Sequence, residues 1–76
     1  MSDSAQAILE GVMKAAIDAA RQLADAAAAG DAFSQGEIMA YYDMLDVIKE
    51  QAELAGLVFE DQVLTDFDPD ELLPDA

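Results

Sequence analysis

The sequence predicts an all-α fold, an antiparallel hairpin of two long helices followed by a C-terminal extension of short helical turns. Apolar residues recur at steps of three and four through two long stretches, which is the period of an amphipathic helix. A glycine closes each stretch, and the link between them is short. No stretch alternates apolar and polar residues for long enough to indicate a strand. We therefore divide the chain into a hairpin at residues 1–56 and a C-terminal segment at residues 57–76.

The first helix is expected from Ser4 to Ala29, interrupted only by Gly11. Its apolar seam consists of Leu9, Met13, Ala16, Ala20, Leu23 and Ala27, with Ala5, Ile8, Val12, Ala15 and Ala19 beside it. Its polar stripe contains charge pairs one turn apart, Glu10 with Lys14, Asp18 with Arg21 and Arg21 with Asp25. Because these charges compensate one another locally, we interpret the stripe as solvated scaffold rather than as a binding site.

The turn between the helices carries both a stop and a start signal. Gly30 follows a run of alanines and is suited to the left-handed conformation that closes a helix. Ser34 is the expected N-cap of the second helix, and Glu37 three residues later completes a capping box. Phe33 and Ile38 occupy the positions of a hydrophobic staple. The two helices are thus predicted to be antiparallel neighbours.

The second helix is expected to end at Gly56, with Leu57 folding back on the last turn. One ridge of its apolar face is made of Ile38, Tyr41, Tyr42, Leu45, Ile48, Ala52 and Ala55, and a neighbouring ridge is made of Met44, Val47 and Leu54. The opposite side is acidic, with Asp43, Asp46, Glu50 and Glu53 at helical spacing. Only Lys49 lies near enough to offset these carboxylates.

Two apolar ridges on each helix need more cover than one partner helix supplies. We therefore expect the hairpin to dimerise into a four-helix bundle. The residues expected at this dimer interface are Leu9, Met13, Ile38, Tyr41, Tyr42, Leu45 and Ile48. A monomer closed by its own C-terminal segment is the competing arrangement.

The C-terminal segment carries seven acids and no base. Residues 57–67 are expected to pack over the uncovered flank of the hairpin. Asp68 followed by Pro69 is a further helix start, and Pro74 is expected to stop it after about one turn. For the last nine residues two readings stay open, packing on the hairpin or folding only on a partner. The residues expected to bind a partner in this tail are Phe67, Asp68, Asp70, Glu71, Leu72 and Leu73.

The composition disfavours several classes of function. The chain has 17 acids, three bases and a formal charge of −14, which argues against direct binding to nucleic acid. Without His or Cys it lacks the usual catalytic base, the strongest nucleophile and the common zinc ligands, so we expect no enzyme, cofactor or metal site. Asp66, Asp68 and Asp70 match the start of an EF-hand loop, but Glu71 stands where that loop requires glycine.

We expect a soluble, cytoplasmic protein, because no secretory signal and no run of 18 apolar residues is present. The leading functional hypothesis is a small acidic module that binds or inhibits a basic protein, as immunity proteins, antitoxins and phage inhibitors do. The acidic stripe of the second helix is its expected contact surface. The alternatives are a structural or adaptor homodimer without a charge-based partner, and a mimic of nucleic acid.

Overall fold

The computed structural model describes residues 3–73, and these residues form helices and no strand. The elements are α1 (Asp3–Gln22), α2 (Ala24–Ala28), α3 (Ala32–Leu54), α4 (Gln62–Asp66) and the 3-10 helix η1 (Pro69–Leu72). The all-α prediction is therefore confirmed for this part of the chain. The stop expected at Pro74 lies outside the described residues. Among the described helices, none is long and apolar enough to cross a membrane.

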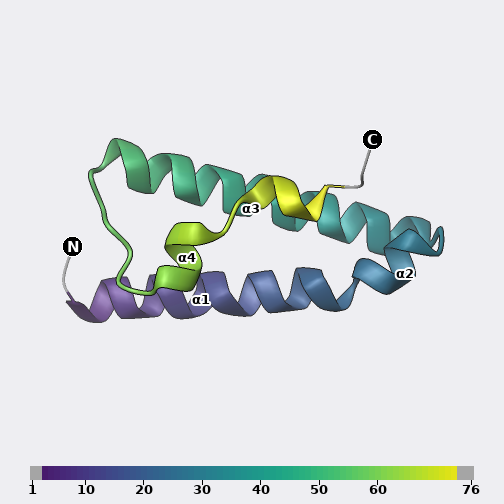
Figure 1. Ribbon diagram of the computed structural model, residues 1–76, viewed down its shortest axis with the longest axis horizontal. Helices are drawn as coiled ribbons and strands as arrows, with labels where there is room; N and C mark the ends of the chain where they lie inside the picture. The colour runs from purple at the N-terminus through teal and green to yellow at the C-terminus, as the bar shows by residue number, and fades with distance from the viewer. Residues whose placement is uncertain (1–2, 74–76) are drawn as a thin grey trace.

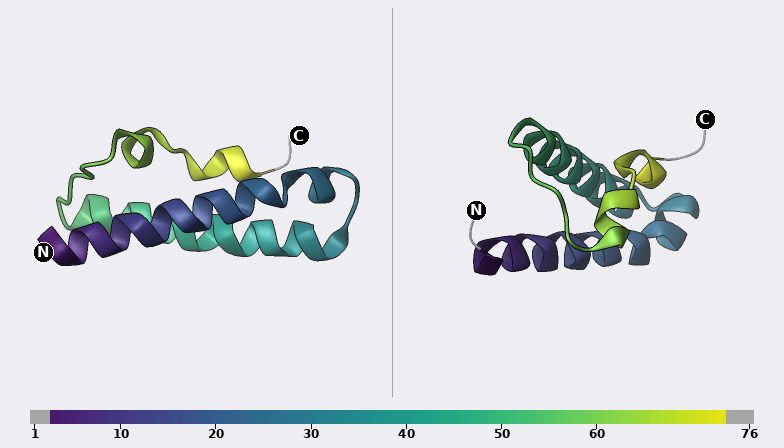
Figure 2. Two further views of the ribbon diagram at one scale, coloured as in Figure 1. Left: turned by 90° about the horizontal axis from the view of Figure 1, so that it is seen from below. Right: turned by 60° about the vertical axis from the view of Figure 1, so that its left-hand side comes forward.

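The helices form two layers. Helices α1 and α3 run antiparallel and together make one layer, with α2 at their connected end (Figure 1). The described part of the C-terminal segment, residues 57–73, returns along one side of this layer and carries α4 and η1 (Figure 2). The other side of the α1–α3 layer has no part of the described chain over it.

The hydrophobic core lies between the two layers. It is built from Met13 and Ile17 of α1, Leu45 of α3, and Leu64 and Phe67 of the C-terminal segment. All five side chains are at most 4% exposed. The C-terminal segment therefore completes the core of a single chain, as the competing monomeric arrangement required.

The side chains expected at a dimer interface lie mostly in this interior. Met13, Ile38 and Leu45 are buried within one chain. The partly buried residues that pack against the core include Leu9, Tyr41 and Ile48, and Tyr42 is half-buried. These residues cover the chain's own core, so a second copy would have to dock mainly through other side chains.

The first helix is bent rather than continuous to Ala29. It ends at Gln22, and the Leu23 N–H donates to the Ala20 carbonyl oxygen over 3.1 Å, which is the tighter three-residue step of a 3-10 turn. After this bend α2 lies against α3, where the Gln35 side-chain amide donates to the Ala27 carbonyl oxygen over 3.0 Å. The apolar periodicity of the sequence continues through this bend, so it did not predict the interruption. The bend is seen only together with the contact between α2 and α3.

Both predicted glycine caps are confirmed. Gly30 and Gly56 have φ angles of 97° and 71°, in the left-handed region that glycine adopts without a steric penalty. After α3 the Leu57 N–H donates to the Ala52 carbonyl oxygen over 2.9 Å, and the Gly56 N–H donates to the Glu53 main-chain carbonyl oxygen over 3.1 Å. This pair of bonds is the Schellman motif, and it fixes the direction in which the C-terminal segment leaves α3.

The N-cap of α3 is Asp31, not Ser34. The Asp31 carboxylate accepts hydrogen bonds from the Ser34 N–H over 3.1 Å and from the Ser34 hydroxyl over 2.5 Å. These two bonds lower the pKa of Asp31. Because a carboxylate is the stronger acceptor, the helix begins three residues earlier than expected. Phe33 then falls inside the first turn and is exposed, so it does not form the predicted staple.

The glycines provide a test of the helix ends. Gly56→Ala places a Cβ on a backbone with φ of 71° and is expected to destabilise the chain by about 1–2 kcal/mol. Gly36→Ala, inside α3 with open space around the new Cβ, is expected to stabilise it by about 0.5–1 kcal/mol. Urea denaturation followed by circular dichroism measures both changes. Equal effects of the two substitutions would contradict the assigned cap.

Candidate functional site: an acidic groove along α3

The three basic side chains of the molecule all hold the C-terminal segment to the hairpin. Lys14 forms an ion pair with Asp61 over 2.8 Å, and Arg21 forms one with Glu71 over 2.5 Å. The Lys49 ammonium donates to two main-chain carbonyl oxygens of the segment. They belong to Thr65, at 3.3 Å, and to Phe67.

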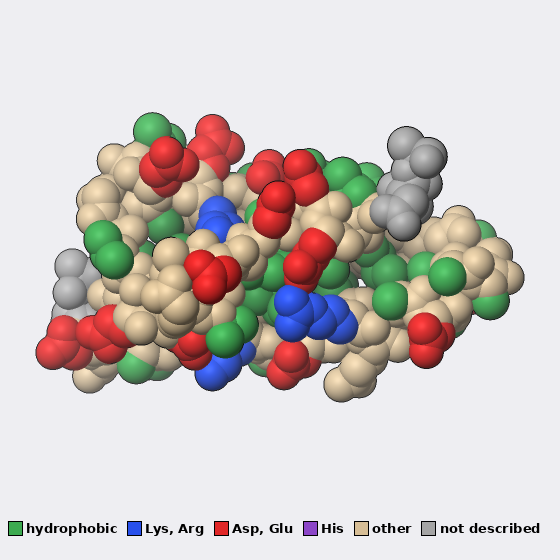
Figure 3. Space-filling view, in the orientation of Figure 1, with side chains coloured by type: hydrophobic (Ala, Val, Ile, Leu, Met, Phe, Trp, Pro, Cys, Tyr) green, Lys and Arg blue, Asp and Glu red, His purple; other side chains and the backbone are tan. Residues whose placement is uncertain are grey.

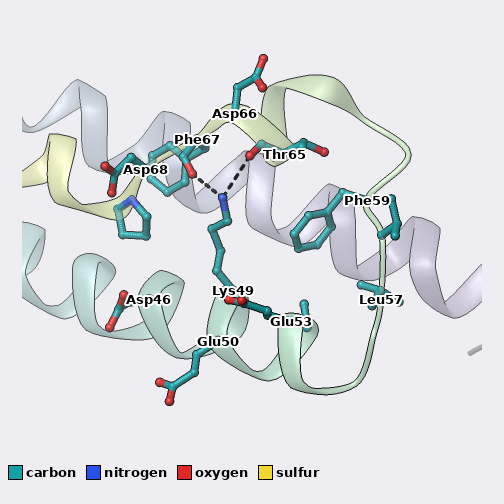
Figure 4. Close-up of a pocket in the computed structure, with 13 residues that line it drawn as sticks. Asp46, Lys49, Glu50, Glu53, Leu57, Phe59, Thr65, Asp66, Phe67 and Asp68 are labelled. Atoms are coloured by element: carbon teal, nitrogen blue, oxygen red, sulfur yellow. Dashed lines mark hydrogen bonds between the residues drawn. The ribbon is translucent and has the colours of Figure 1, made fainter.

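This arrangement corrects the expected charge pairs. Within residues 3–73 the two ion pairs of Lys14 and Arg21 join residues about 50 positions apart, rather than neighbours on α1. Local pairing contributes only about 0.2–0.5 kcal/mol, so a well-placed distant carboxylate readily replaces it. The ammonium of Lys49 likewise points to the C-terminal segment instead of offsetting the acids of α3 (Figure 4).

A buried carboxylate organises the start of this segment. Glu10 is 7% exposed and accepts hydrogen bonds from the Glu60 N–H over 3.1 Å, the Asp61 N–H over 2.9 Å and the Gln6 side-chain amide over 2.8 Å. The bond from Gln6, followed by the two main-chain bonds, lowers the pKa of Glu10. The sequence contained a signal for this role, because Glu10 precedes Met13 and Ile17 by three and seven residues and so shares their face.

Asp61 has two roles at the same junction. Its carboxylate pairs with Lys14 and also caps α4 by accepting the Val63 N–H over 2.9 Å. The bond from Lys14 is the larger cause of the lowered pKa of Asp61, and the same bond raises the pKa of Lys14. These contacts set where α4 begins, and therefore where Leu64 and Phe67 enter the core.

A groove of about 760 Å³ lies between α3 and the C-terminal segment. Its apolar lining includes Leu57, Phe59, Phe67 and Pro69. The charged residues that line it are Asp46, Glu50 and Glu53 from α3, Asp66 and Asp68 from the segment, and Lys49 between them (Figure 4). The groove thus combines apolar surface with five acidic residues and one ammonium that is already bound to carbonyl oxygens. The side chains of Glu50 and Asp66 point away from this ammonium, toward the outside of the groove (Figure 4).

The acidic stripe predicted on α3 is exposed and unpaired. Asp43, Asp46, Glu50 and Glu53 are all exposed, and within residues 3–73 none of them forms an ion pair. Carboxylates also stand out on the face of the molecule that carries the C-terminal segment, where they outnumber the basic groups (Figure 3). The helical spacing of the sequence predicted the acidic residues of the groove that lie on α3. It could not predict that Asp66 and Asp68 line the opposite side of the groove.

The residues expected to bind a partner through the tail serve mainly the chain's own fold. Phe67 is in the core, Leu72 packs against it and Leu73 is half-buried. Asp68 accepts the Asp70 N–H over 3.0 Å as the N-cap of η1. The side-chain carboxylate of Glu71 pairs with Arg21.

Asp70 is exposed, and its negative charge is the main cause of a raised pKa of Tyr42. The segment expected either to pack or to await a partner is therefore folded on the hairpin as far as Leu73. Of the six tail residues, Phe67 and Asp68 also line the groove.

The side chains that line the groove are suited to contact basic side chains of another molecule. Within residues 3–73 no three Asp or Glu side chains are grouped so that they could hold a metal ion. Its carboxylates can accept charge-assisted hydrogen bonds from Lys or Arg, and its apolar lining can contact the methylene stems of such side chains. Comparisons with protein families, curated proteins and solved structures found no match to this chain.

Proposed function

We propose that this chain is a small binding module whose acidic groove takes a basic segment of another protein. One observation supports the proposal above others. All three bases are engaged in holding the C-terminal segment, so the carboxylates of Asp46, Glu50 and Glu53 have no ion-pair partner in the described chain. A partner rich in Lys or Arg would supply the missing charge, speed association and make binding sensitive to salt.

The fold supports a rigid presentation of this groove. One wall is the long helix α3, and the other is held by Lys49, by the Arg21–Glu71 pair and by the burial of Phe67. A preformed groove loses little conformational entropy on binding. As its specific form we propose inhibition of a cytoplasmic protein at a basic site.

The test is capture of partners from the native cell by the immobilised chain at low and high salt. We expect the triple variant Asp46→Asn, Glu50→Gln, Glu53→Gln to retain roughly tenfold less partner, because each exposed ion pair contributes about 0.2–1 kcal/mol. The charge-matched control is Asp3→Asn, Asp18→Asn, Asp25→Asn, which removes three exposed carboxylates outside the groove. Equal capture by both variants would contradict the proposed site.

Two alternative functions predict different results in binding experiments. A nucleic-acid mimic would compete with DNA or RNA for its partner, and neutralising Asp43, Asp46, Glu50 and Glu53 together would abolish that competition. An adaptor homodimer would bind its partner with little dependence on salt, and neutralising these four residues would leave that binding unchanged. Carboxylates one turn apart occur on any acidic helix, so the mimic has no support beyond the stripe itself.

A further inference from the structure

The side of the α1–α3 layer opposite the C-terminal segment has no part of the described chain over it (Figure 2). On α1, Arg21 faces the segment, and Val12 lies nine residues away, which at about 100° per residue is the opposite side of the helix. On α3, Lys49 faces the segment, and Val47, two residues before it, lies about 200° around the helix axis. We call this surface the back face.

The back face exposes large apolar side chains. Ile8 and Val12 of α1 and Met44, Val47 and Leu54 of α3 are each at least 52% exposed. They belong to the second ridges that the sequence pattern identified on each helix. The C-terminal segment completes the core beneath the first ridges and leaves these second ridges in solvent.

A groove adjoins the back face at the end of the hairpin where α3 ends. Its volume is about 670 Å³, and its lining includes Leu9 of α1, Val47, Ile48 and Gln51 of α3, and Leu57 and Val58 of the C-terminal segment. No Asp, Glu, Lys or Arg contributes to this lining. This groove therefore differs from the acidic groove along α3, because its lining carries no charged side chain.

The charge distribution favours a second copy of the chain as the occupant. Two molecules that each carry a charge of −14 repel one another wherever carboxylates face carboxylates. The row Ile8, Val12, Ala15, Ala19 on α1 and the row Ala40, Met44, Val47, Gln51 on α3 contain no charged residue. The back face is thus a surface on which a second acidic chain can approach closely.

The size of this side is compatible with a dimer interface. The rectangle that encloses the molecule in the plane of the α1–α3 layer measures 41 by 21 Å, or roughly 860 Å², which is an upper bound on the area projected by this side. A standard protein interface buries about 800 Å² on each partner. A chain of 76 residues without cysteine has few other means of gaining stability, since small chains bury a low fraction of their surface.

We propose that two copies pack back face to back face about a two-fold axis and form a four-helix bundle of two α1 and two α3 helices. In such a dimer each copy presents the same surface, so exposed apolar side chains of one copy fill the groove of the other. The acidic grooves then lie on the two outer sides. This interface uses mainly the second ridges. Of the first-ridge residues expected from the sequence, only Leu9 and Ile48 take part, as lining of the groove.

Sedimentation equilibrium tests this proposal. The wild-type chain is expected to have twice its 8.1 kDa mass. Val12→Glu and Met44→Glu each place a carboxylate in the interface and are expected to raise the dimer dissociation constant by at least roughly 100-fold. The matched control is Val63→Glu, which adds the same charge at an exposed valine of α4 on the other side and is expected to leave the dimer intact.

A second measurement needs no variant. The thermal midpoint of the wild-type chain should rise with protein concentration, because association stabilises the folded state by mass action. Wild-type chain that remains at 8.1 kDa, with a midpoint independent of concentration, would overturn the proposal. So would a dimer that is weakened as much by Val63→Glu as by Val12→Glu, because the contact would then not be at the back face.

Discussion

Replacing Phe67 by alanine is expected to lower the free energy of unfolding by about 3–5 kcal/mol. The ring is 4% exposed and belongs to the core cluster, and the Arg21 guanidinium carbon lies 5.9 Å from its centroid. A chain of this length has a total stability of roughly 4–11 kcal/mol. The substitution therefore removes a large share of what holds the fold, and many molecules should be unfolded at 37 °C.

Urea denaturation followed by far-ultraviolet circular dichroism measures this effect. The control is Val63→Ala in α4, which is 54% exposed and should change the stability by less than about 0.5 kcal/mol. A loss below about 1 kcal/mol for Phe67→Ala would mean that the C-terminal segment does not complete the core. Partner capture by the acidic groove should fall with Phe67→Ala, because the second wall of the groove is then released.

Glu10→Gln is expected to destabilise the fold at neutral pH by loosening the start of α4. Glutamine keeps the size of the side chain but replaces one acceptor oxygen by an NH₂ group, which cannot accept from the main-chain N–H groups of Glu60 and Asp61. At least one of these part-buried N–H groups then loses its hydrogen-bond partner in the protein. We expect a clear fall in the thermal midpoint, measured at pH 7.

The pH dependence of this effect has a defined sign. The folded-state pKa of Glu10 is lowered from its ordinary value of 4.5, so the ionised form stabilises the fold at pH values above 4.5. That stabilisation is lost as the pH falls through the folded-state pKa. The difference in stability between wild type and Glu10→Gln should thus be constant near neutrality and shrink below pH 4.5.

The matched control is Glu50→Gln, the same chemical change at an exposed residue of α3. It should leave the stability nearly unchanged at neutral pH. If Glu10→Gln behaved like Glu50→Gln, the hydrogen bonds to Glu10 would contribute nothing to the fold. Comparing each variant with wild type at every pH removes the general effect of neutralising the other carboxylates.

Much of the hairpin could be predicted because its signals are local. Gly30 and Gly56 end their helices through bonds within the preceding turn, and apolar spacing assigns the two faces of each helix. The start of α3 was misplaced for an equally local reason, since Asp31 and Ser34 are both good caps and only one can act. The acidic stripe of α3 followed from helical spacing alone.

The sequence by itself determined the helical class, the two long helices, the glycine ends and the excess of carboxylates over bases. Only the tertiary structure decided which ridge of each helix became the core and which stayed exposed. It also directed Lys14, Arg21 and Lys49 to the C-terminal segment instead of to neighbouring acids. The physical reason is the distance along the chain between the residues that interact. A helix cap or an apolar period is encoded within a few neighbouring residues. The path of the C-terminal segment depends instead on burying Leu64 and Phe67 against helices that are far away in the sequence.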